Sequence, residues 1–328
     1  MNILKTKYLG LELKSPIIAG SCGMTNSIEH LVELEKAGAG AIVLKSIFEE
    51  QIINEISQNI MEQNLDFMYP EAIDYIANYT EMYKLEEYIA FIREAKKSVA
   101  IPIIASINCS SAGEWTKYAK KIQDAGADAI ELNIFVLPAN VKITSDQYEN
   151  QYFAIVDSIK KHVSIPIAVK TSVYFSAFAK MIEKLSWSGV NGFVMFNRFY
   201  SPDIDIENFK ITSANVFSKG DEYTLPLRWT AILHDVIKSD ICASTGIHDG
   251  ETAIKMILAG ANAVQVASAL YKPGFQVITD MNNTIENWME RHNYKSVEEF
   301  RGKMSYKNIE NPSAYQRIQF MKYFSGIE

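Results

Sequence analysis

One short phrase occurs three times along the chain and constrains its fold more than any other feature. It joins a glycine to small residues and reads Ala37-Gly38-Ala39-Gly40, Ala125-Gly126-Ala127-Asp128 and Ala259-Gly260-Ala261-Asn262. Each copy ends a helical pattern, where glycine is the usual cap, and a short apolar run follows at once. Helices that turn directly into buried strands predict repeated strand–helix units and a parallel sheet.

The number of apolar runs indicates how this sheet closes. Eight runs qualify as strands: 17–19, 41–44, 103–107, 129–132, 167–169, 192–196, 241–244 and 263–267. Helical patterns separate them at 27–37, 85–97, 114–125, 147–162, 177–186, 229–238 and 250–258. Eight near-regular units predict an α/β fold of the (β/α)8 type, the TIM barrel, in preference to an open doubly wound sheet. The whole chain, residues 1–328, is expected to form one domain around this barrel.

Four segments lie outside the repeat. Residues 8–13 alternate between apolar and polar, which predicts an N-terminal hairpin that closes the bottom of the barrel. Insertions follow strand 2 (47–98) and strand 6 (198–227), on the side where barrels build pockets and lids. From about residue 306 to 328 the chain is an appendage rich in aromatic residues, which we expect to make the subunit contact of a homodimer.

Composition and charge argue against several classes of function. The formal net charge is −7 and no cluster of Lys and Arg appears, so nucleic acid is not an expected partner. No window holds the roughly 18 consecutive apolar residues of a membrane span, and the N-terminus lacks a secretory signal. We therefore expect a cytoplasmic protein that does not enter a membrane. Three widely spaced cysteines, and histidines on helical patterns, predict neither a disulfide framework nor a metal site.

Polar residues at the carboxyl ends of the strands of such a barrel point into the active site. Along the chain these end positions are Ala19-Gly20-Ser21, Lys45-Ser46, Asn108, Asn133, Lys170-Thr171, Asn197, Thr245-Gly246 and Ala267-Ser268. A lysine directly after an apolar strand has a buried stem and needs a partner for its ammonium. We therefore interpret Lys45 and Lys170 as functional.

The last two strands end in turns that offer bare backbone N–H groups, Thr245-Gly246 and Ala267-Ser268. Ordinary tight turns are one interpretation. The other is a cradle for a phosphate, at the place where barrels bind it. The lysine of the fifth strand and the amides of the fourth and sixth favour flavin mononucleotide (FMN), because Lys170 could stabilise negative charge at the N1/O2 edge of the reduced ring.

Between about residues 8 and 305 the sequence resembles the dihydroorotate dehydrogenase family. The resemblance lies in the blocks Ser15-Pro16 to Gly20, Leu44-Lys45-Ser46, Glu131-Leu132-Asn133, Val169-Lys170, Asn197, Thr245-Gly246-Ile247, Ala259-Gly260-Ala261, 265–270 and Phe300-Arg301-Gly302-Lys303. It implies an FMN barrel that acts on a small cyclic molecule of pyrimidine metabolism.

The resemblance also implies roles for residues. Lys170 would lie at the flavin N1/O2 edge, Lys45 and Ser46 near flavin and substrate, and Asn133 and Asn197 between the two. The phosphate would lie on Thr245-Gly246 and Ala267-Ser268, with Thr245 and Ala267 where the family usually has glycine. Further expected FMN contacts are Ala19, Gly20 and Asn108.

The chain departs from the family pattern at the proton-abstracting base. The family loop after the fourth strand reads Asn-Leu-Ser-Cys-Pro-Asn, and its Cys, or Ser in the membrane-bound class, removes the C5 proton of dihydroorotate. Here residues 133–140 read Asn-Ile-Phe-Val-Leu-Pro-Ala-Asn, so the position of the base is apolar. Substitutes are Cys109 and Ser110 after the third strand, or Tyr200, Ser213 and Ser218 in the second insertion.

Three functions fit these residues. The first is a flavin-dependent dehydrogenase that acts on CH–CH bonds, with Lys45, Asn133 and Asn197 as catalytic residues. The second is a Schiff-base lyase or aldolase on the same barrel, in which Lys45 or Lys170 attacks a phosphosugar. The third is a non-catalytic flavin-binding paralogue. The sequence favours the first.

Overall fold

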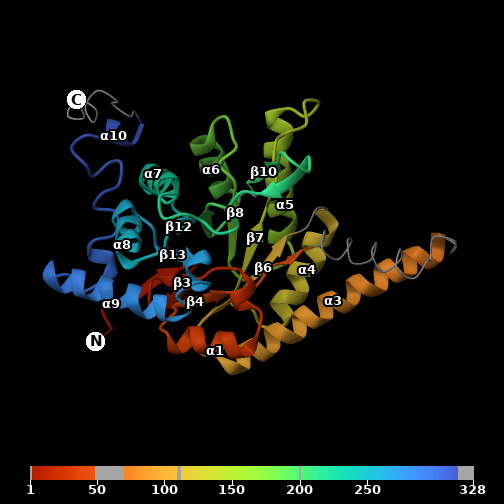
Figure 1. Cartoon of the computed structure of the whole chain (residues 1–328), viewed down its shortest axis with the longest axis horizontal. Coiled ribbons are helices and arrows are strands. Elements are labelled where there is room, and N and C mark those ends of the chain that lie inside the picture. Colours follow the sequence, from red (N-terminus) through yellow and green to blue (C-terminus); the bar gives the residue numbers. More distant parts are fainter. Residues whose placement is uncertain (1, 49–69, 109–111, 199–200, 317–328) are drawn as a thin grey trace.

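The computed structural model describes residues 2–48, 70–108, 112–198 and 201–316. Within these ranges eight parallel strands form a closed ring (Figure 1). In ring order they are β3 (Ile17–Ala19), β4 (Ala41–Val43), β6 (Ile103–Asn108), β7 (Ala129–Asn133), β8 (Ile167–Thr171), β9 (Gly192–Met195), β12 (Asp240–Ser244) and β13 (Ala263–Val266). The ring closes because β3 pairs with both β13 and β4, and β4 pairs with β6. The predicted (β/α)8 barrel is confirmed.

Helices surround the ring, as Figure 1 shows. They are α1 (Ile28–Lys36), α3 (Pro70–Ser98), α4 (Ala112–Asp124), α5 (Ser145–Lys160), α6 (Phe178–Trp187), α7 (Thr224–Leu233), α8 (Gly250–Ala259) and α9 (Gln276–Arg291). The prediction for α7, residues 229–238, was wrong by about a turn at each end. The helix begins earlier because Pro226 lies in its first turn, where a missing N–H costs no hydrogen bond.

The repeated glycine phrase ends helices as predicted. Gly38, Gly126 and Gly260 all have positive φ, at 97°, 97° and 124°. Gly260 is also required by packing, since a Cβ there would lie 2.3 Å from His234 Cγ. The left-handed turn sends the chain directly from helix to strand.

The N-terminal hairpin closes the lower end of the barrel. Its strands β1 (Thr6–Tyr8) and β2 (Leu11–Leu13) pair antiparallel, and Tyr8 and Leu13 are buried against the barrel interior. The backbone N–H of Leu9 donates to the Asp240 carboxylate at 2.7 Å. Because this end is filled by side chains, a ligand has access to the barrel from the opposite end.

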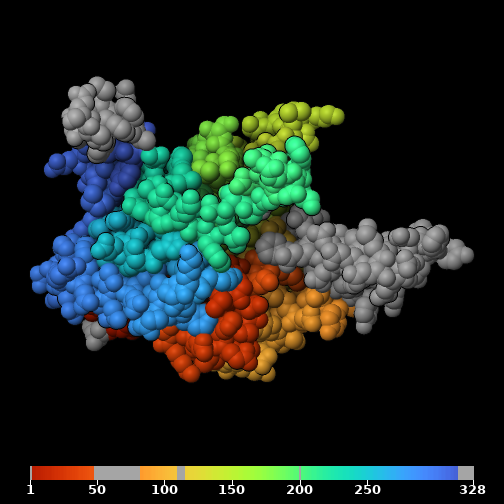
Figure 2. Space-filling model, viewed as in Figure 1, coloured from red at the N-terminus to blue at the C-terminus, as the bar shows by residue number. Residues whose placement is uncertain are grey.

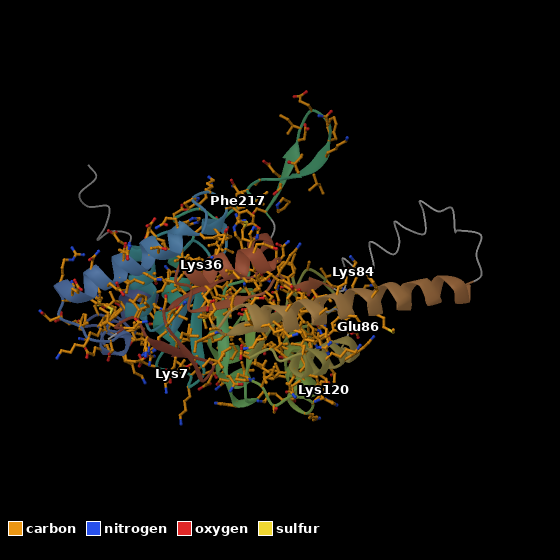
Figure 3. The ribbon with its side chains drawn as sticks, turned by 90° about the horizontal axis from the view of Figure 1, so that it is seen from below. Lys7, Lys36, Lys84, Glu86, Lys120 and Phe217 are labelled. Atoms are coloured by element: carbon orange, nitrogen blue, oxygen red, sulfur yellow. The ribbon has the colours of Figure 1, made fainter. Side chains whose placement is uncertain are left out.

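The insertion after strand 6 contains a second hairpin, β10 (Pro202–Asp205) and β11 (Lys210–Ser213). It projects from the barrel, as Figure 3 shows, and its apolar side chains Ile204 and Ile211 are 66% and 77% exposed. The helix α3, which ends the insertion after strand 2, extends away from the barrel on one side in Figure 1. In the space-filling view of Figure 2 the β10–β11 hairpin, in green, lies on the surface of the molecule. None of the described helices is long and apolar enough to cross a bilayer.

Candidate active site

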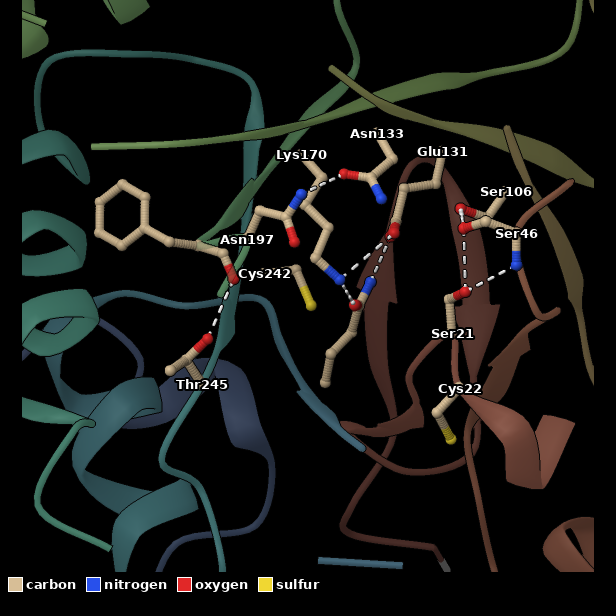
Figure 4. Close-up of polar contacts among 12 residues, drawn as sticks. Ser21, Cys22, Ser46, Ser106, Glu131, Asn133, Lys170, Asn197, Cys242 and Thr245 are labelled. Atoms are coloured by element: carbon tan, nitrogen blue, oxygen red, sulfur yellow. Dashed lines mark hydrogen bonds and ion pairs between the residues drawn. The ribbon is translucent and has the colours of Figure 1, made fainter. Parts of the chain in front are cut away.

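Three polar side chains meet inside the upper end of the barrel, and Figure 4 labels two of them, Glu131 and Lys170. They are Glu131 on β7, Lys170 on β8 and Gln265 on β13. The Lys170 ammonium lies 3.6 Å from Glu131 Oε1 and donates to Gln265 Oε1 at 3.3 Å. The Gln265 amide in turn donates to Glu131 Oε2. Glu131 and Gln265 are buried and Lys170 is 11% exposed, so Lys170 is the member of this group nearest the mouth.

Two predicted amides lie beside the lysine. Asn197 Nδ2 donates to Asn133 Oδ1, and Asn133 is directly opposite Lys170 in the β7–β8 register. The structure therefore brings Lys170, Asn133 and Asn197 together, as the sequence predicts. The remaining polar atoms of the two amides are available to a ligand in the mouth.

A chain of hydroxyls lies on the other side of the mouth. Ser46 Oγ is 3.0 Å from Ser21 Oγ and 2.6 Å from Ser106 Oγ. The Ser46 N–H also donates to Ser21 Oγ at 2.9 Å. These bonds fix the ends of β3, β4 and β6 relative to one another, and they orient Ser46 toward its neighbours.

The two turns predicted as a phosphate cradle leave their backbone donors free. Within the described part of the chain, the N–H groups of Gly246, Ile247, Ala267 and Ser268 donate to no acceptor. A Cβ on Gly246 would lie 2.3 Å from Tyr223 N, so only glycine fits this close approach. Converging free N–H groups are the donor set that an anionic group such as a phosphate requires.

Thr245 adopts a left-handed conformation with φ of 79°, which a β-branched residue rarely takes. Its hydroxyl donates to the Phe196 carbonyl oxygen at 3.0 Å, which holds the turn to the end of β9. This bond offsets part of a backbone strain of about 1–3 kcal/mol. A threonine therefore occupies a turn that suits glycine without losing the backbone N–H groups that follow it.

The second insertion supplies part of the wall of the mouth through Arg198 and Ser218. Arg198 forms a two-pronged ion pair with Glu222, with its Nε 2.8 Å from Oε2, and donates to the carbonyl of Asn215 at 2.9 Å. A cavity of about 140 Å³ lies beneath, lined by Lys170, Asn197, Arg198, Gly246, Gln265 and Ser268 among others. A second cavity of about 320 Å³ shares Asn197 and Arg198 with the first. The amide of Asn197 thus faces two adjoining spaces, one containing the cradle.

Other predicted residues are placed less directly. Lys45 is exposed as a whole residue at the mouth, whereas Lys170 is largely buried. Asn108 is half-buried at the end of β6. Ala19 packs its side chain into the core outside the barrel ring, which leaves its backbone facing the site. Ser218 lies at the cradle, where its N–H donates to Ser268 Oγ at 3.1 Å and its hydroxyl contacts His248.

No base occupies the described part of the loop after β7. Ile134 is buried, and Leu137 to Asn140 are exposed. The Asn140 side chain accepts from the Lys142 N–H at 3.0 Å and so stabilises its own turn. The candidate bases Cys109, Ser110 and Tyr200 lie outside the described residues, and Ser213 is exposed on β11.

Cys22, one of the three cysteines, lies near the site after β3. It is half-buried, and both Lys45 and Lys170 are close enough to influence it. Burial raises the pKa of the Cys22 thiol, more than the two lysines lower it. The thiol is therefore protonated at neutral pH. No three His, Cys, Asp or Glu side chains of the described chain cluster as a metal site would require.

Glu131 and Gln265 are the site residues that the sequence interpretation missed. The signal was present, because successive residues of a strand alternate between its two faces. Glu131 is two residues before Asn133, and Gln265 is two before Ala267. Both therefore share the inward face with residues that were assigned to the site.

Fold and site together define a (β/α)8 barrel in which free backbone N–H groups suited to a phosphate adjoin a buried lysine. The donor set fits FMN on two observations: the free N–H groups of the cradle, and an ammonium deeper in the same cavity. The family model for dihydroorotate dehydrogenase matches residues 3–289. The chain belongs to the dihydroorotate dehydrogenase family, and it is an FMN-dependent oxidoreductase.

Curated relatives agree over nearly the full length. The chain is 27% identical to a dihydroorotate dehydrogenase B (NAD(+)), catalytic subunit, of Thermoplasma volcanium, over 92% of this chain and 98% of the relative. It is 28% identical to the protein of the same name from Methanocaldococcus jannaschii, over 89% and 95%. A third, from Alkaliphilus metalliredigens, is 26% identical over 92% and 98%.

Proposed function

We propose that this chain is a dehydrogenase that transfers hydride between a CH–CH bond of a small cyclic, dihydroorotate-like substrate and FMN. The observation that carries the proposal is the single cavity that holds both the Lys170 ammonium and the free N–H groups of the cradle. FMN has a phosphate at one end and a ring that becomes negatively charged at the other, so it needs hydrogen-bond donors for both. Here β8 supplies the donor for the ring, and the turns after β12 and β13 supply the donors for the phosphate.

Each group of residues has a distinct task in this proposal. The Gly246 and Ser268 turns bind the phosphate. Lys170 stabilises negative charge at the N1/O2 edge. When bound, FMN supplies a hydride acceptor at N5. The amides of Asn133 and Asn197 orient flavin and substrate, since they are already bonded to each other at the mouth.

Lys45 and the serine chain complete the substrate side. The exposed Lys45 ammonium can reach an anionic substrate from the rim of the mouth, because it lies directly after β4. Ser46 is held by Ser21 and Ser106, so it presents a fixed hydroxyl and not a mobile one. A carboxylate on the substrate is the chemical group that such a rim would bind.

The purified protein tests the proposal directly. It is expected to be yellow and to release FMN in a 1:1 ratio on denaturation. Substrates are then assayed anaerobically by bleaching of the flavin, with dihydroorotate and related cyclic acids. A colourless protein that refuses FMN, and that is trapped covalently by borohydride with a phosphosugar, would replace the dehydrogenase with a Schiff-base lyase.

We further propose that the chain acts as a homodimer in the cytoplasm. The relatives carry the words "catalytic subunit" in their names, which concerns those proteins and leaves a second kind of subunit as the alternative. The free thiols Cys22 and Cys242 suit a reducing compartment. Most of the aromatic appendage that suggested a subunit contact lies outside the described residues. The exposed hairpin β10–β11 is the described surface that supports assembly.

A further inference from the structure

The Glu131 carboxylate is an unusual group to find in the centre of a barrel. It is 1% exposed, and two of the neighbouring inward positions hold the small apolar residues Ala129 and Ala168. Burying a carboxylate is costly unless a cation and hydrogen bonds compensate for lost water. The compensation here is specific: the ammonium of Lys170 and the amide of Gln265.

Hydrogen-bond chemistry fixes the orientation of this group. A lysine ammonium has only donors and an ionised carboxylate has only acceptors. Gln265 therefore has one arrangement that satisfies both, with its carbonyl toward Lys170 and its NH2 toward Glu131. The bridging amide holds the ammonium at the top of the barrel while the carboxylate remains below it.

One carboxylate oxygen of the group accepts no hydrogen bond. Glu131 Oε1 is buried and has no hydrogen-bond partner among the described residues, and the nearest cation is Lys170 at 3.6 Å. The carboxylate thus acts on the ammonium through charge as well as through Gln265. The charge of Glu131 also acts on Cys242, which lies below it in the barrel. The pKa of the Cys242 thiol is raised, chiefly by burial and to a lesser extent by the Glu131 charge.

We propose that Glu131 is a positioning residue that acts through Lys170 and Gln265 and sets the reduction potential of the flavin. The inference rests on the proposed role of Lys170 at the N1/O2 edge. A fully uncompensated ammonium would over-stabilise the negatively charged reduced ring. The carboxylate offsets part of that charge and keeps the ammonium aimed at the mouth, so the flavin can pass its electrons on.

The proposal predicts the sign of two substitutions. Glu131→Gln keeps the shape and removes a negative charge, so the reduced flavin becomes more stable and the potential rises. Gln265→Glu adds a negative charge beside the ammonium, so the potential falls. A tenfold change in the equilibrium constant for reduction corresponds to about 30 mV for a two-electron couple, and we expect shifts of at least this size.

Asp240→Asn is the matched control. Asp240 is a half-buried carboxylate of the same barrel, but it lies at the lower end, where it accepts from the Leu9 N–H and from Asn262 Nδ2. Its removal changes the net charge of the protein by the same amount as Glu131→Gln. A general charge or stability effect moves both variants alike, whereas the proposed role moves only one.

The experiment is an anaerobic redox titration of the FMN-loaded full chain and its three variants, with a reference dye and the flavin spectrum as readout. The inference is supported if, relative to wild type, the flavin potential rises in Glu131→Gln, falls in Gln265→Glu and does not change in Asp240→Asn. The inference is overturned if Glu131→Gln and Gln265→Glu both have the same flavin potential as Asp240→Asn. If Glu131→Gln does not fold, the Gln265→Glu shift alone decides. If both fail to fold or to hold FMN, the group is structural and the inference is wrong. A wild type without FMN instead contradicts the proposed function.

Discussion

The charge of Lys170 is the residue-scale feature on which flavin chemistry depends. Replacing Lys170 by Ala removes the ammonium and leaves Glu131 buried without its cation. The reduced ring then loses its partner, so the flavin potential is expected to fall by at least 30 mV, a tenfold change in the equilibrium constant. The titration that measures it should include Lys96→Ala. Lys96 is also paired with a carboxylate, Asp128 at 2.6 Å, but far from the mouth at the end of α3. An unchanged potential in Lys170→Ala would remove this lysine from the flavin site.

Gly246 offers a second test at the same scale. Its φ is 74° and a Cβ would lie 2.3 Å from Tyr223 N. Gly246→Ala is therefore expected to weaken FMN binding at least tenfold, by displacing the turn that holds the phosphate. Gly246→Asp should abolish binding, because it adds a carboxylate against the phosphate.

Gly10 is the control for backbone strain. It has a similar φ of 77°, yet a Cβ there would meet nothing within 4 Å. Gly10→Ala should cost about 1 kcal/mol of stability and leave FMN affinity unchanged. Affinity measured by fluorescence quenching of added FMN separates the two variants. Equal effects on binding would mean that strain, and not the cradle, explains the Gly246 result.

The site could be predicted from the sequence only where a residue follows an apolar run. Lys170, Asn133 and Asn197 were found in this way, because strand ends face the mouth. Glu131 and Gln265 lie within their runs and were taken as part of the strands. Lys45 follows a strand too, yet it is exposed. The position after a strand fixes where a lysine starts, whereas its burial depends on neighbours that only the fold brings together.

At the scale of elements, the Arg198–Glu222 pair joins the two ends of the second insertion, residues 198–227. Burial raises the pKa of the Glu222 carboxyl. The hydrogen bonds from Arg198 and the Lys219 N–H, with the Arg198 charge, outweigh burial and hold the pKa below the ordinary value of a glutamate. Because the pKa is lowered in the folded state, the ionised carboxylate gives its full stabilisation at pH values above the ordinary pKa of a glutamate. This stabilisation is lost as the pH falls through the folded pKa.

The insertion is therefore expected to loosen in acid, below about pH 4.5, before the barrel unfolds. Hydrogen exchange across residues 201–222 at pH 7 and at pH 3.5 measures this, after correction for intrinsic rates. Glu222→Gln should show the looser pattern at both values. A Glu222→Gln variant that is as well protected as wild type at pH 7, or a wild type with equal protection at pH 7 and pH 3.5, would exclude the ion pair as the tie.

The loop after β7 decides what the enzyme can oxidise. Removing a proton from C5 of dihydroorotate needs a base, which is typically worth about 10²–10⁴ in rate. The loop has Val136 and Leu137 at the two possible positions of that base. We expect turnover of dihydroorotate to be at least 10²-fold below the usual enzyme range of about 1–10³ per second.

A gain-of-function pair makes this prediction sharper. Val136→Cys and Leu137→Cys place a thiol at each alignment of the family base, and one of them should raise the rate. The wild-type assay uses several electron acceptors, NAD⁺ included. Turnover in the usual range without any substitution would sink the prediction. Cys109→Ala and Ser110→Ala would then identify the base.

The elements themselves were largely predictable, and the reasons are local. Each barrel strand is a short run of apolar residues that leads to a polar position, and three of the runs follow the glycine phrase. The position of such a run in the sequence therefore coincides with the strand in the structure. The β10–β11 hairpin was not predicted, because it buries little and its pattern carries no core signal. Ile204 and Ile211 are apolar but exposed, so hydrophobicity alone did not indicate that they lie in paired strands on the surface.

At the scale of the whole molecule, that hairpin leads to the prediction on assembly. Ile204 and Ile211 are directly paired across β10 and β11, so both side chains lie on one face of the ribbon. A two-stranded ribbon alone in water is marginally stable. A second copy that covers this face around a two-fold axis would bury it in both subunits at once, which is how most soluble homo-oligomers close.

Sedimentation at micromolar concentration is therefore expected to show a dimer of a 37.0 kDa chain. Ile211→Lys places a charge in the contact and should shift the protein toward monomer by at least tenfold in dissociation constant. Val141→Lys is the control, because Val141 is 99% exposed on a different loop and belongs to no such face. A wild type that sediments as a monomer contradicts the homodimer. If Ile211→Lys leaves the dimer intact, the contact lies on a surface other than the hairpin. The aromatic appendage would then be the first segment to mutate.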